Sequence, residues 1–297
     1  MASPSQPFAL PTTSTRRATS KRRADLIKMA VVYLLLGLGA IFVCIPFVWM
    51  LSTSLKDEAS VFLFPPEWVP RPVQPQNYLE AMTVLPFGVF FRNTLITTLV
   101  PIVGALASCS LVAYSFSRLR WPGRDALFLI VLATMMLPEQ VTMIPQFILF
   151  KNLGWVDTFW PLIIPPYFAV GSFNIFLLRQ FFMTIPLEMD DAAEIDGASI
   201  LGIYWRIILP LSKPALAAVS IFVFQAHWND FLYPLIYLHS KNNFTLALGL
   251  RAFQGQYGTD WNLLMAASLV VMAPLLILFF VAQRYFIQGV VFSGVKG

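Results

Sequence analysis

Long apolar runs separated by short polar segments dominate this chain of 297 residues. A helix that crosses a bilayer needs about 20 mostly apolar residues, and an interruption by one or two polar side chains is tolerated. The pattern predicts six such spans, at roughly 28–52, 88–116, 125–149, 160–181, 214–238 and 262–284. We therefore expect an all-α membrane protein with six transmembrane helices.

The composition agrees with this class, because 58% of the residues are hydrophobic and only 12% are charged. A soluble domain carries about 25% charged residues. Cytoplasmic loops of membrane proteins are enriched in Lys and Arg. If both termini are cytoplasmic, fourteen Lys and Arg residues lie on the cytoplasmic side and six outside. We therefore predict a multi-pass membrane protein with both termini in the cytoplasm.

Residues 1–25 are rich in Ser, Thr, Pro and Arg and lack an apolar face. Such a composition predicts a disordered basic tail in the cytoplasm. Residues 26–297 then form the transmembrane domain. The chain has no Gly-rich phosphate loop and no cluster typical of a metal or nucleophile site. The sequence therefore favours a transport or channel subunit over an intramembrane enzyme, and we expect no cofactor on this chain.

The segment 183–213 is the longest polar break that still carries helical signals. Pro186 suits the first turn of a helix, and acidic residues follow it at the positive end of the helix dipole. We predict a short helix over about 186–196 and a glycine turn at Gly197. A second helix, capped by Ser199, then runs to Ile208 and is stopped by Pro210 and Pro214.

This segment also departs from the basic bias of the cytoplasmic side, with five acidic and three basic residues over 179–213. A partner protein with a basic groove would explain the acidic excess. An ordinary amphipathic connector on the membrane face would explain it as well. The residues alone leave both interpretations open.

A small group of polar and aromatic residues lies within the predicted third and fifth spans. Ionisable side chains in a bilayer usually face a cavity or a partner. We expect this group to line a substrate path, or else to pair helices within or between subunits: Glu139, Gln140, Trp228, Asn229, Asp230 and Tyr233. The two carboxylates could also carry protons in an ion- or proton-coupled secondary transporter, which is the alternative function.

The spacing in the polar segment resembles a known cytoplasmic motif. Asp191-Ala192-Ala193 is followed after three residues by Gly197, and after nine more by Ile207-Ile208-Leu209-Pro210. This arrangement resembles the Glu-Ala-Ala, Gly, Ile-x-Leu-Pro motif of ABC importer permeases. The departure is Asp191, which stands where that family usually has Glu and is one methylene shorter.

Other stretches resemble the carbohydrate branch of these permeases, specifically the second permease of maltose-type systems. They are Phe64-Pro65-Pro66 with Asn77-Tyr78, Ala113 to Leu119 with Pro122-Gly123, Trp228 to Phe231 with Pro234-Leu235, and Gly294 to Gly297. Together they cover nearly the whole chain after the tail.

The resemblance implies a type I ABC importer permease in the cell (inner) membrane of a bacterium or archaeon. It implies a related second permease, two ATP-binding subunits that hold ATP and Mg, and a periplasmic or lipid-anchored solute-binding protein. The substrate would be a sugar, oligosaccharide, related glycoside or glycerol phosphate. The residues that would couple to the ATPase subunit are Glu188, Asp191, Ala192, Ala193, Glu194, Asp196, Gly197, Ala198, Leu209 and Pro210.

Overall fold

The structure, a computed structural model, describes the backbone of residues 15–254 and 259–294 and the side chains of residues 25–254 and 259–283. The chain divides into two compact units, Met1–Ser52 and Thr53–Gly297. Apart from one isolated bridge between Gln254 and Thr259, the described residues form helices and turns without strands.

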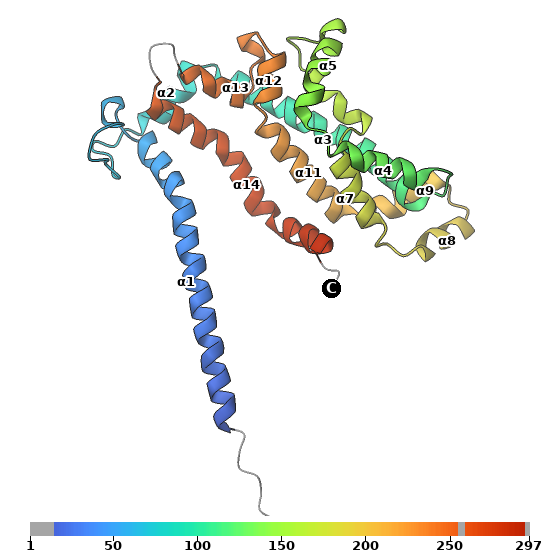
Figure 1. Ribbon diagram of the computed structural model, residues 1–297. Coiled ribbons are helices and arrows are strands. Elements are labelled where there is room, and N and C mark those ends of the chain that lie inside the picture. Colours follow the sequence, from blue (N-terminus) through green and yellow to red (C-terminus); the bar gives the residue numbers. More distant parts are fainter. Residues whose placement is uncertain (1–14, 255–258, 295–297) are drawn as a thin grey trace, which may run out of the picture. The chain divides into compact units, whose positions relative to one another are not determined.

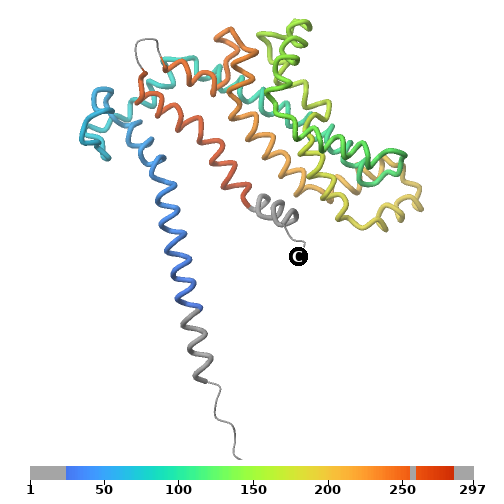
Figure 2. Tube along the Cα trace, viewed as in Figure 1, coloured from blue at the N-terminus to red at the C-terminus, as the bar shows by residue number. Residues whose placement is uncertain are grey.

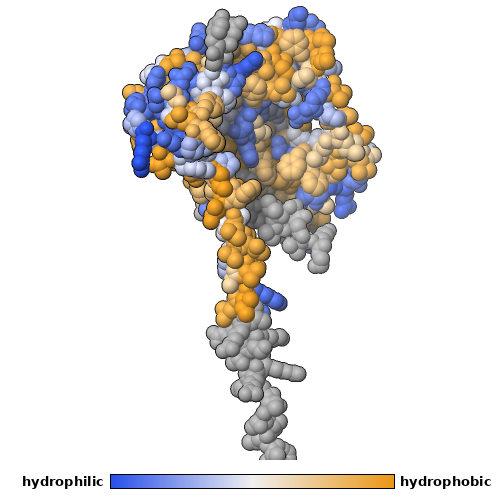
Figure 3. All heavy atoms as spheres, turned by 60° about the vertical axis from the view of Figure 1, so that its left-hand side comes forward, coloured by the Kyte–Doolittle hydropathy of each residue, from blue (hydrophilic) through white to orange (hydrophobic). Residues whose placement is uncertain are grey.

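The first unit is the long helix α1, which runs over Thr15–Ser54 and continues into the second unit by its last two residues. Its stretch Asp25–Ser54 is long and apolar enough to cross a membrane. Figure 3 shows this helix as a mostly apolar column, as expected for a lipid-facing surface. Because α1 starts at Thr15, residues 15–25 are helical where the sequence predicts disorder. Residues 1–14 of the predicted tail lie outside the described residues.

The second unit is organised around α3, Phe87–Arg118, against which α7 (Ser172–Phe182) and α11 (Lys213–Trp228) pack. The helix α14, Trp261–Gly294, packs on α11 and on α2, Gln76–Val84. Gly104 allows the segment that contains Tyr167 to lie close against α3. A Cβ on Gly104 would lie 2.4 Å from the ring of Tyr167, so the close approach requires glycine.

The predicted third span, 125–149, is a bent pair of helices. Helix α4, Arg124–Thr134, and helix α5, Glu139–Asn152, meet at 94° across a break of four residues (Figure 2, green). Pro138 precedes α5 with extended backbone, which ends the helical geometry before it. The apolar stretch 125–149 is therefore two helices rather than one, and the polar residue Glu139 lies at the start of the second.

The predicted fourth span, 160–181, is interrupted in a milder way. It consists of α6 (Trp160–Ile163), a 3₁₀ turn η2 (Pro165–Phe168) and α7, and together they still qualify as one apolar stretch, Trp160–Phe182. Pro161 near the start of α6 and Pro165 at the start of η2 lack the N–H donors of a continuous helix, which accounts for the tighter turn.

The predicted fifth span, 214–238, agrees with α11 only as far as Trp228. The helix then breaks, and a short helix α12 follows over Leu232–Tyr237. By length and composition, four described helices could each cross a membrane, and up to six spans result if each bent pair counts as one.

Four further elements are short. They comprise η1 (Glu58–Ser60), η4 (Lys241–Asn243), α13 (Leu246–Leu250) and η5 (Arg251–Phe253). The buried amide of Asn93 on α3 donates to the carbonyls of Asn242 and Phe244 and anchors this part of the chain. Within the second unit, α2, α5, α12 and α13 lie toward one end and α8 (Glu188–Ile195) toward the other (Figure 1).

Candidate functional site

The helix α8, Glu188–Ile195, is the exposed element at one end of the second unit. Glu188, Asp190 and Asp191 occupy its first turn, where carboxylates stabilise the positive end of the helix dipole. The helix lies within the predicted range 186–196. Its short length means that packing, rather than intrinsic propensity, holds it.

The helix ends in a glycine turn of a well-known type. Gly197 has φ of +82°, and its N–H donates to the carbonyl of Glu194, while the N–H of Ala198 donates to that of Ala193. These two bonds form a Schellman motif, which requires a left-handed residue at the glycine position. A Cβ on Gly197 would meet nothing within 4 Å. The backbone conformation, rather than space, therefore requires glycine.

The second half of the loop begins with the predicted cap, because Ser199 Oγ accepts from the N–H of Gly202 at 3.1 Å. Helix α9 covers Ile200–Ile203 and continues through a π-helical turn, η3, over Tyr204–Ile208. Pro210 does not stop this segment as the sequence predicts, since α10 follows over Leu209–Leu211. The chain turns at Ser212, and the segment Ile200–Leu211 meets α11 at 77°.

The two faces of α8 have different roles. Asp190 and Ala193, three residues apart, face the chain's own core and are each 9% exposed. The sequence placed Ala193 with Ala192 on the face offered to a partner, and the structure assigns the two alanines to opposite faces. Among the other predicted coupling residues, Ala198 and Leu209 are half-buried, whereas six are exposed: Glu188, Asp191, Ala192, Glu194, Asp196 and Gly197, together with Pro210 beyond the helix.

A buried ion pair fixes α8 to the end of α3. Arg118 Nη1 lies 3.4 Å from Asp190 Oδ2, and the two side chains are 2% and 13% exposed. Arg118 Nη2 also donates to the carbonyls of Phe182 and Ile185 at 2.6 and 2.7 Å. Burial raises the pKa of the Asp190 carboxyl, and the Arg118 guanidinium offsets part of that rise. The sequence showed both residues but gave no sign that they pair.

Large apolar side chains stand beside the acidic ones on this loop, and the sequence prediction did not include them. Leu187 is 52% exposed, Ile195 86%, Leu201 59% and Trp205 63%. An apolar surface mixed with charges is typical of protein–protein contact. Their signal in the sequence was the presence of apolar residues at positions that no core or span explains.

Three of the predicted path residues come together at the opposite end of the unit. Tyr233 Oη donates to Glu139 Oε2 at 3.4 Å, and Asp230 Oδ1 accepts from the Tyr233 N–H at 3.2 Å. The cluster therefore joins the start of α5 to the start of α12, at the two breaks in the predicted spans. Gln140 and Asn229 are exposed, and Asn229 Nδ2 donates to the carbonyl of Gln225 within its own helix.

Trp228 does not belong to this cluster. It is 2% exposed, its Nε1–H donates to the Val271 carbonyl at 3.0 Å, and its ring stacks on Phe224 at 5.2 Å. The edge of Phe91 covers it further, at 6.1 Å. A ring covered in this way packs α11 against α14 and presents no face to a sugar.

A carboxylate that the sequence prediction missed ties two loops together at this same end. Asp157, which has φ of +61°, accepts hydrogen bonds from the N–H groups of His239 and Ser240 at 2.9 Å, from the Ser240 hydroxyl and from the Asn243 amide. The Ser240 hydroxyl, with the other donors, holds the pKa of Asp157 well below its usual range. The two loops therefore form one rigid surface.

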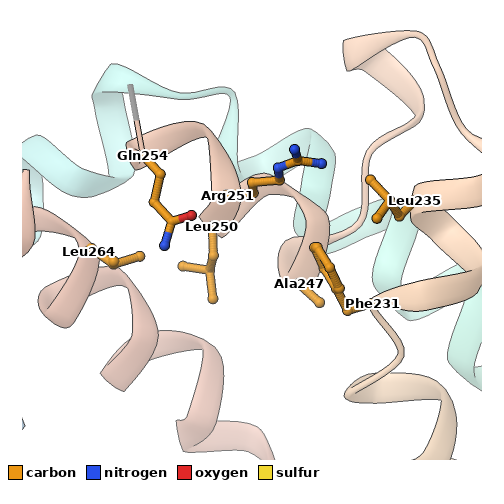
Figure 4. A pocket seen from close by; sticks show the side chains of 7 residues that line it. All are labelled: Phe231, Leu235, Ala247, Leu250, Arg251, Gln254 and Leu264. Atoms are coloured by element: carbon orange, nitrogen blue, oxygen red, sulfur yellow. The ribbon is translucent and has the colours of Figure 1, made fainter. Parts of the chain in front are cut away.

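A hollow of about 450 Å³ is lined by residues of α12, α13 and η5, by their flanking residues and by the start of α14 (Figure 4). Its lining is mainly apolar, with two polar side chains: Phe231, Leu235, Ala247, Leu250, Arg251, Gln254 and Leu264. The volume lies within the range of about 300–1,000 Å³ of small-molecule sites. Arg251 and Gln254 are not in the group that the sequence predicts to line a substrate path.

Comparison with known proteins relates the chain to transport permeases. Residues 101–291 match the family described as "Binding-protein-dependent transport system inner membrane component". A probable ABC transporter permease protein, YurM of Bacillus subtilis (strain 168), is 31% identical over 277 residues, covering 93% of this chain and 91% of its own.

Two further similarities concern saccharide transport. The arabinooligosaccharides transport system permease protein AraQ of Halalkalibacterium halodurans is 38% identical over 247 residues, which is 83% of this chain and 86% of that protein. A chain in the crystal structure of a bacterial ABC transporter involved in the import of the acidic polysaccharide alginate superposes with a TM-score of 0.79 at 26% identity. The match covers 93% of this chain and 100% of that one.

Proposed function

The chain belongs to the family of inner membrane components of binding-protein-dependent transport systems, and we propose that it forms half of the transmembrane channel of an ATP-driven sugar importer. In this proposal it crosses the membrane six times, with both termini in the cytoplasm and each bent helix pair counted as one span. A related permease supplies the other half, as a heterodimer. The names of AraQ and of the alginate transporter favour a sugar, oligosaccharide or related glycoside as the substrate.

The observation that carries the proposal is the geometry of α8. The helix is fixed to the chain's own core by Asp190 and Ala193, and it exposes Asp191, Ala192 and Glu194 on the other side. An element that is rigid on one face and free on the other suits the transmission of movement between proteins. We propose that an ATPase subunit binds this free face.

The contact would combine two kinds of interaction. The exposed carboxylates of Asp191 and Glu194 attract basic groups, while the Ile195 side chain, 86% exposed, supplies apolar area to bury. Asp191 would make the contact that Glu makes in related permeases, with a side chain one methylene shorter. ATP and Mg are bound by the ATPase subunits, and this chain hydrolyses nothing.

At the other end, the sugar would pass the cluster of Glu139, Asp230 and Tyr233. Carboxylate and phenol oxygens can accept and donate hydrogen bonds to sugar hydroxyls as the ligand passes. The hollow that contains Arg251 and Gln254 lies on the same side, where a solute-binding protein would deliver the sugar. The surface that the hydrogen bonds of Asp157 hold together would be part of the docking surface for that protein.

Reconstitution tests the proposal directly. The permease pair, the ATPase subunits and the solute-binding protein are placed in proteoliposomes, and sugar uptake is measured with ATP inside and without it. Uptake that requires both ATP and the binding protein supports the importer. Uptake driven by a proton gradient in the absence of ATP would instead indicate a secondary transporter with Glu139 and Asp230 as proton carriers.

A further inference from the structure

Three polar residues lie in a row on one face of α3, each four positions after the last: Ser110, Tyr114 and Arg118. Residues spaced by four lie above one another on a helix surface. All three side chains are buried, with Ser110 1% and Tyr114 4% exposed as residues and the Arg118 side chain 2% exposed. Buried polar groups in a row require partners.

Each residue of the row contacts a different part of the α8–η3 segment. The Ser110 hydroxyl lies 2.6 Å from the Tyr204 hydroxyl, and the Tyr114 hydroxyl donates to the Ile200 carbonyl at 3.0 Å. The Arg118 guanidinium pairs with Asp190 of α8. The Tyr114 and Tyr204 rings also pack at 5.2 Å. One side of α3 therefore holds α8, α9 and η3 simultaneously.

Because these contacts are buried, they are costly to break. Breaking a buried hydrogen bond leaves its donor or acceptor without water, so the penalty is larger than at the surface. Arg118 extends the connection to α7 through the carbonyls of Phe182 and Ile185. The row thus joins the exposed loop to two helices of the core.

The covalent route from the loop to the membrane is less direct. The segment Ile200–Leu211 reaches α11 only through the turn at Ser212, where the two axes meet at 77°. A push on α8 along that route would have to pass through a bend. The polar row instead connects α8 and η3 sideways to α3, the helix on which both α7 and α11 pack.

We propose that Ser110, Tyr114 and Arg118 are positioning residues that transmit the movement of α8 to α3, so that the second span of the permease is driven directly by the ATPase subunit. This inference rests on the proposed function, and it adds a specific mechanical route. Loss of the hydroxyl contacts of the row leaves the Arg118–Asp190 pair and the exposed face of α8 in place, but loosens the connection of the loop to α3.

The test measures the number of ATP molecules hydrolysed for each sugar imported by the complete transporter in proteoliposomes. Tyr114→Phe and Tyr204→Phe each remove one hydroxyl and keep the ring. We expect the ratio of ATP to sugar to rise by about fivefold for each variant, the equivalent of one hydrogen bond of about 1 kcal/mol. Capture of the ATPase subunits in detergent is expected to stay at the wild-type level.

The matched control is Tyr167→Phe, which removes a tyrosine hydroxyl that donates to the Val100 carbonyl of α3 away from the loop. The ratio is expected to stay unchanged in this variant. Ser110→Ala provides a second, smaller change, and combined with Tyr204→Phe it should have the effect of either alone, because both remove the same hydrogen bond.

Unchanged ratios in Tyr114→Phe, Tyr204→Phe and Ser110→Ala would overturn the inference, as would an equal rise in Tyr167→Phe. Loss of ATPase capture in these three variants would also overturn it, because the contacts of the row would then shape the docking surface rather than transmit movement. These outcomes differ from failure of the proposed function, in which the wild-type transporter itself shows no ATP-dependent uptake.

Discussion

The guanidinium of Arg118, the last residue of α3, pairs with the carboxylate of Asp190 in the first turn of α8 across 3.4 Å of buried space. Seventy-two positions separate the two residues in the sequence. The pair holds a polar loop against an apolar core, and it does so beside two carbonyl groups that share the same guanidinium.

Substitution of Arg118 and substitution of Asp190 should lower the free energy of unfolding by different amounts. Arg118→Gln leaves the Asp190 carboxylate buried without its cation, so we expect a loss of about 3–5 kcal/mol. Asp190→Asn should cost less, because Arg118 keeps its two carbonyl acceptors and burial already disfavours the ionised carboxyl. Thermal unfolding of the purified protein in detergent measures the order.

Arg124→Gln is the control for this experiment. Its ion pair with Asp125 at 2.9 Å joins side chains that are 26% and 73% exposed, and pairs open to solvent contribute about 0–1 kcal/mol. A larger loss in Asp190→Asn than in Arg118→Gln would contradict the role assigned to Arg118.

The hydrogen bonds that the Asp157 carboxylate accepts predict that stability depends on pH. Since its folded pKa is depressed, its contribution to stability is complete above the unfolded value of about 3.9 and is lost as the pH falls through the folded value. The amide protons of His239 and Ser240, which donate to this carboxylate, should exchange faster in Asp157→Asn than in the wild type at pH 6. The difference in the free energy of unfolding should begin to shrink only below about pH 4.

Asp260→Asn serves as the control, because Asp260 is an exposed carboxylate of the same connection. If Asp157→Asn and Asp260→Asn give the same exchange rates at His239 and Ser240, the Asp157 carboxylate does not hold the loop.

Gly197 predicts a difference between two substitutions at one position. Its φ of +82° is poorly accessible to β-branched residues, so Gly197→Val should cost about 1–2 kcal/mol locally and disturb the end of α8. Asn tolerates the left-handed conformation, and a Cβ meets nothing within 4 Å, so Gly197→Asn should behave nearly as the wild type.

Capture of the ATPase subunits in detergent is the measurement. Membrane insertion should be normal for both variants. Normal capture by Gly197→Val would show that the end of α8 does not need this turn.

Substitutions at the break in the predicted fifth span should separate an effect on transport from an effect on stability. Asp230→Asn keeps the oxygen that accepts from the Tyr233 N–H but removes the charge, so we expect an altered KM for the sugar with little change in Tm. Trp228→Phe loses the hydrogen bond to Val271, so we expect the free energy of unfolding to fall by about 1 kcal/mol, seen as a lower Tm, and the KM to stay unchanged. Uptake kinetics that are the same in Asp230→Asn and the wild type would reject a role in the path.

Local sequence rules predicted the loop well because its signals are local. The acids before Ala192, the turn at Gly197 and the cap at Ser199 each act within four residues, and the structure has all three. Pro210 misled the prediction because it lies in the first turn of α10, where a proline is tolerated, so the segment continues to Leu211.

Hydropathy predicted where apolar stretches lie but not how they bend. The 94° angle between α4 and α5 depends on Pro138 and on partners far along the chain, such as Tyr233 for Glu139. Long-range pairs, including Arg118 with Asp190 and Asp157 with Asn243, have no sequence signal, because either residue alone is an ordinary polar side chain. The sequence likewise does not show which face of α8 is buried, because that depends on how the helix packs against the rest of the chain.

The measurement that tests the central claim most directly is photo-crosslinking from α8 in the assembled transporter. A photo-reactive residue is placed at Ile195, which is 86% exposed on the loop, and in a separate variant at Phe168, which is 75% exposed in η2. We expect the residue at Ile195 to crosslink to the ATPase subunit in a complex that still imports sugar, and the residue at Phe168 not to do so. An active transporter in which Ile195 gives no such crosslink would contradict the account.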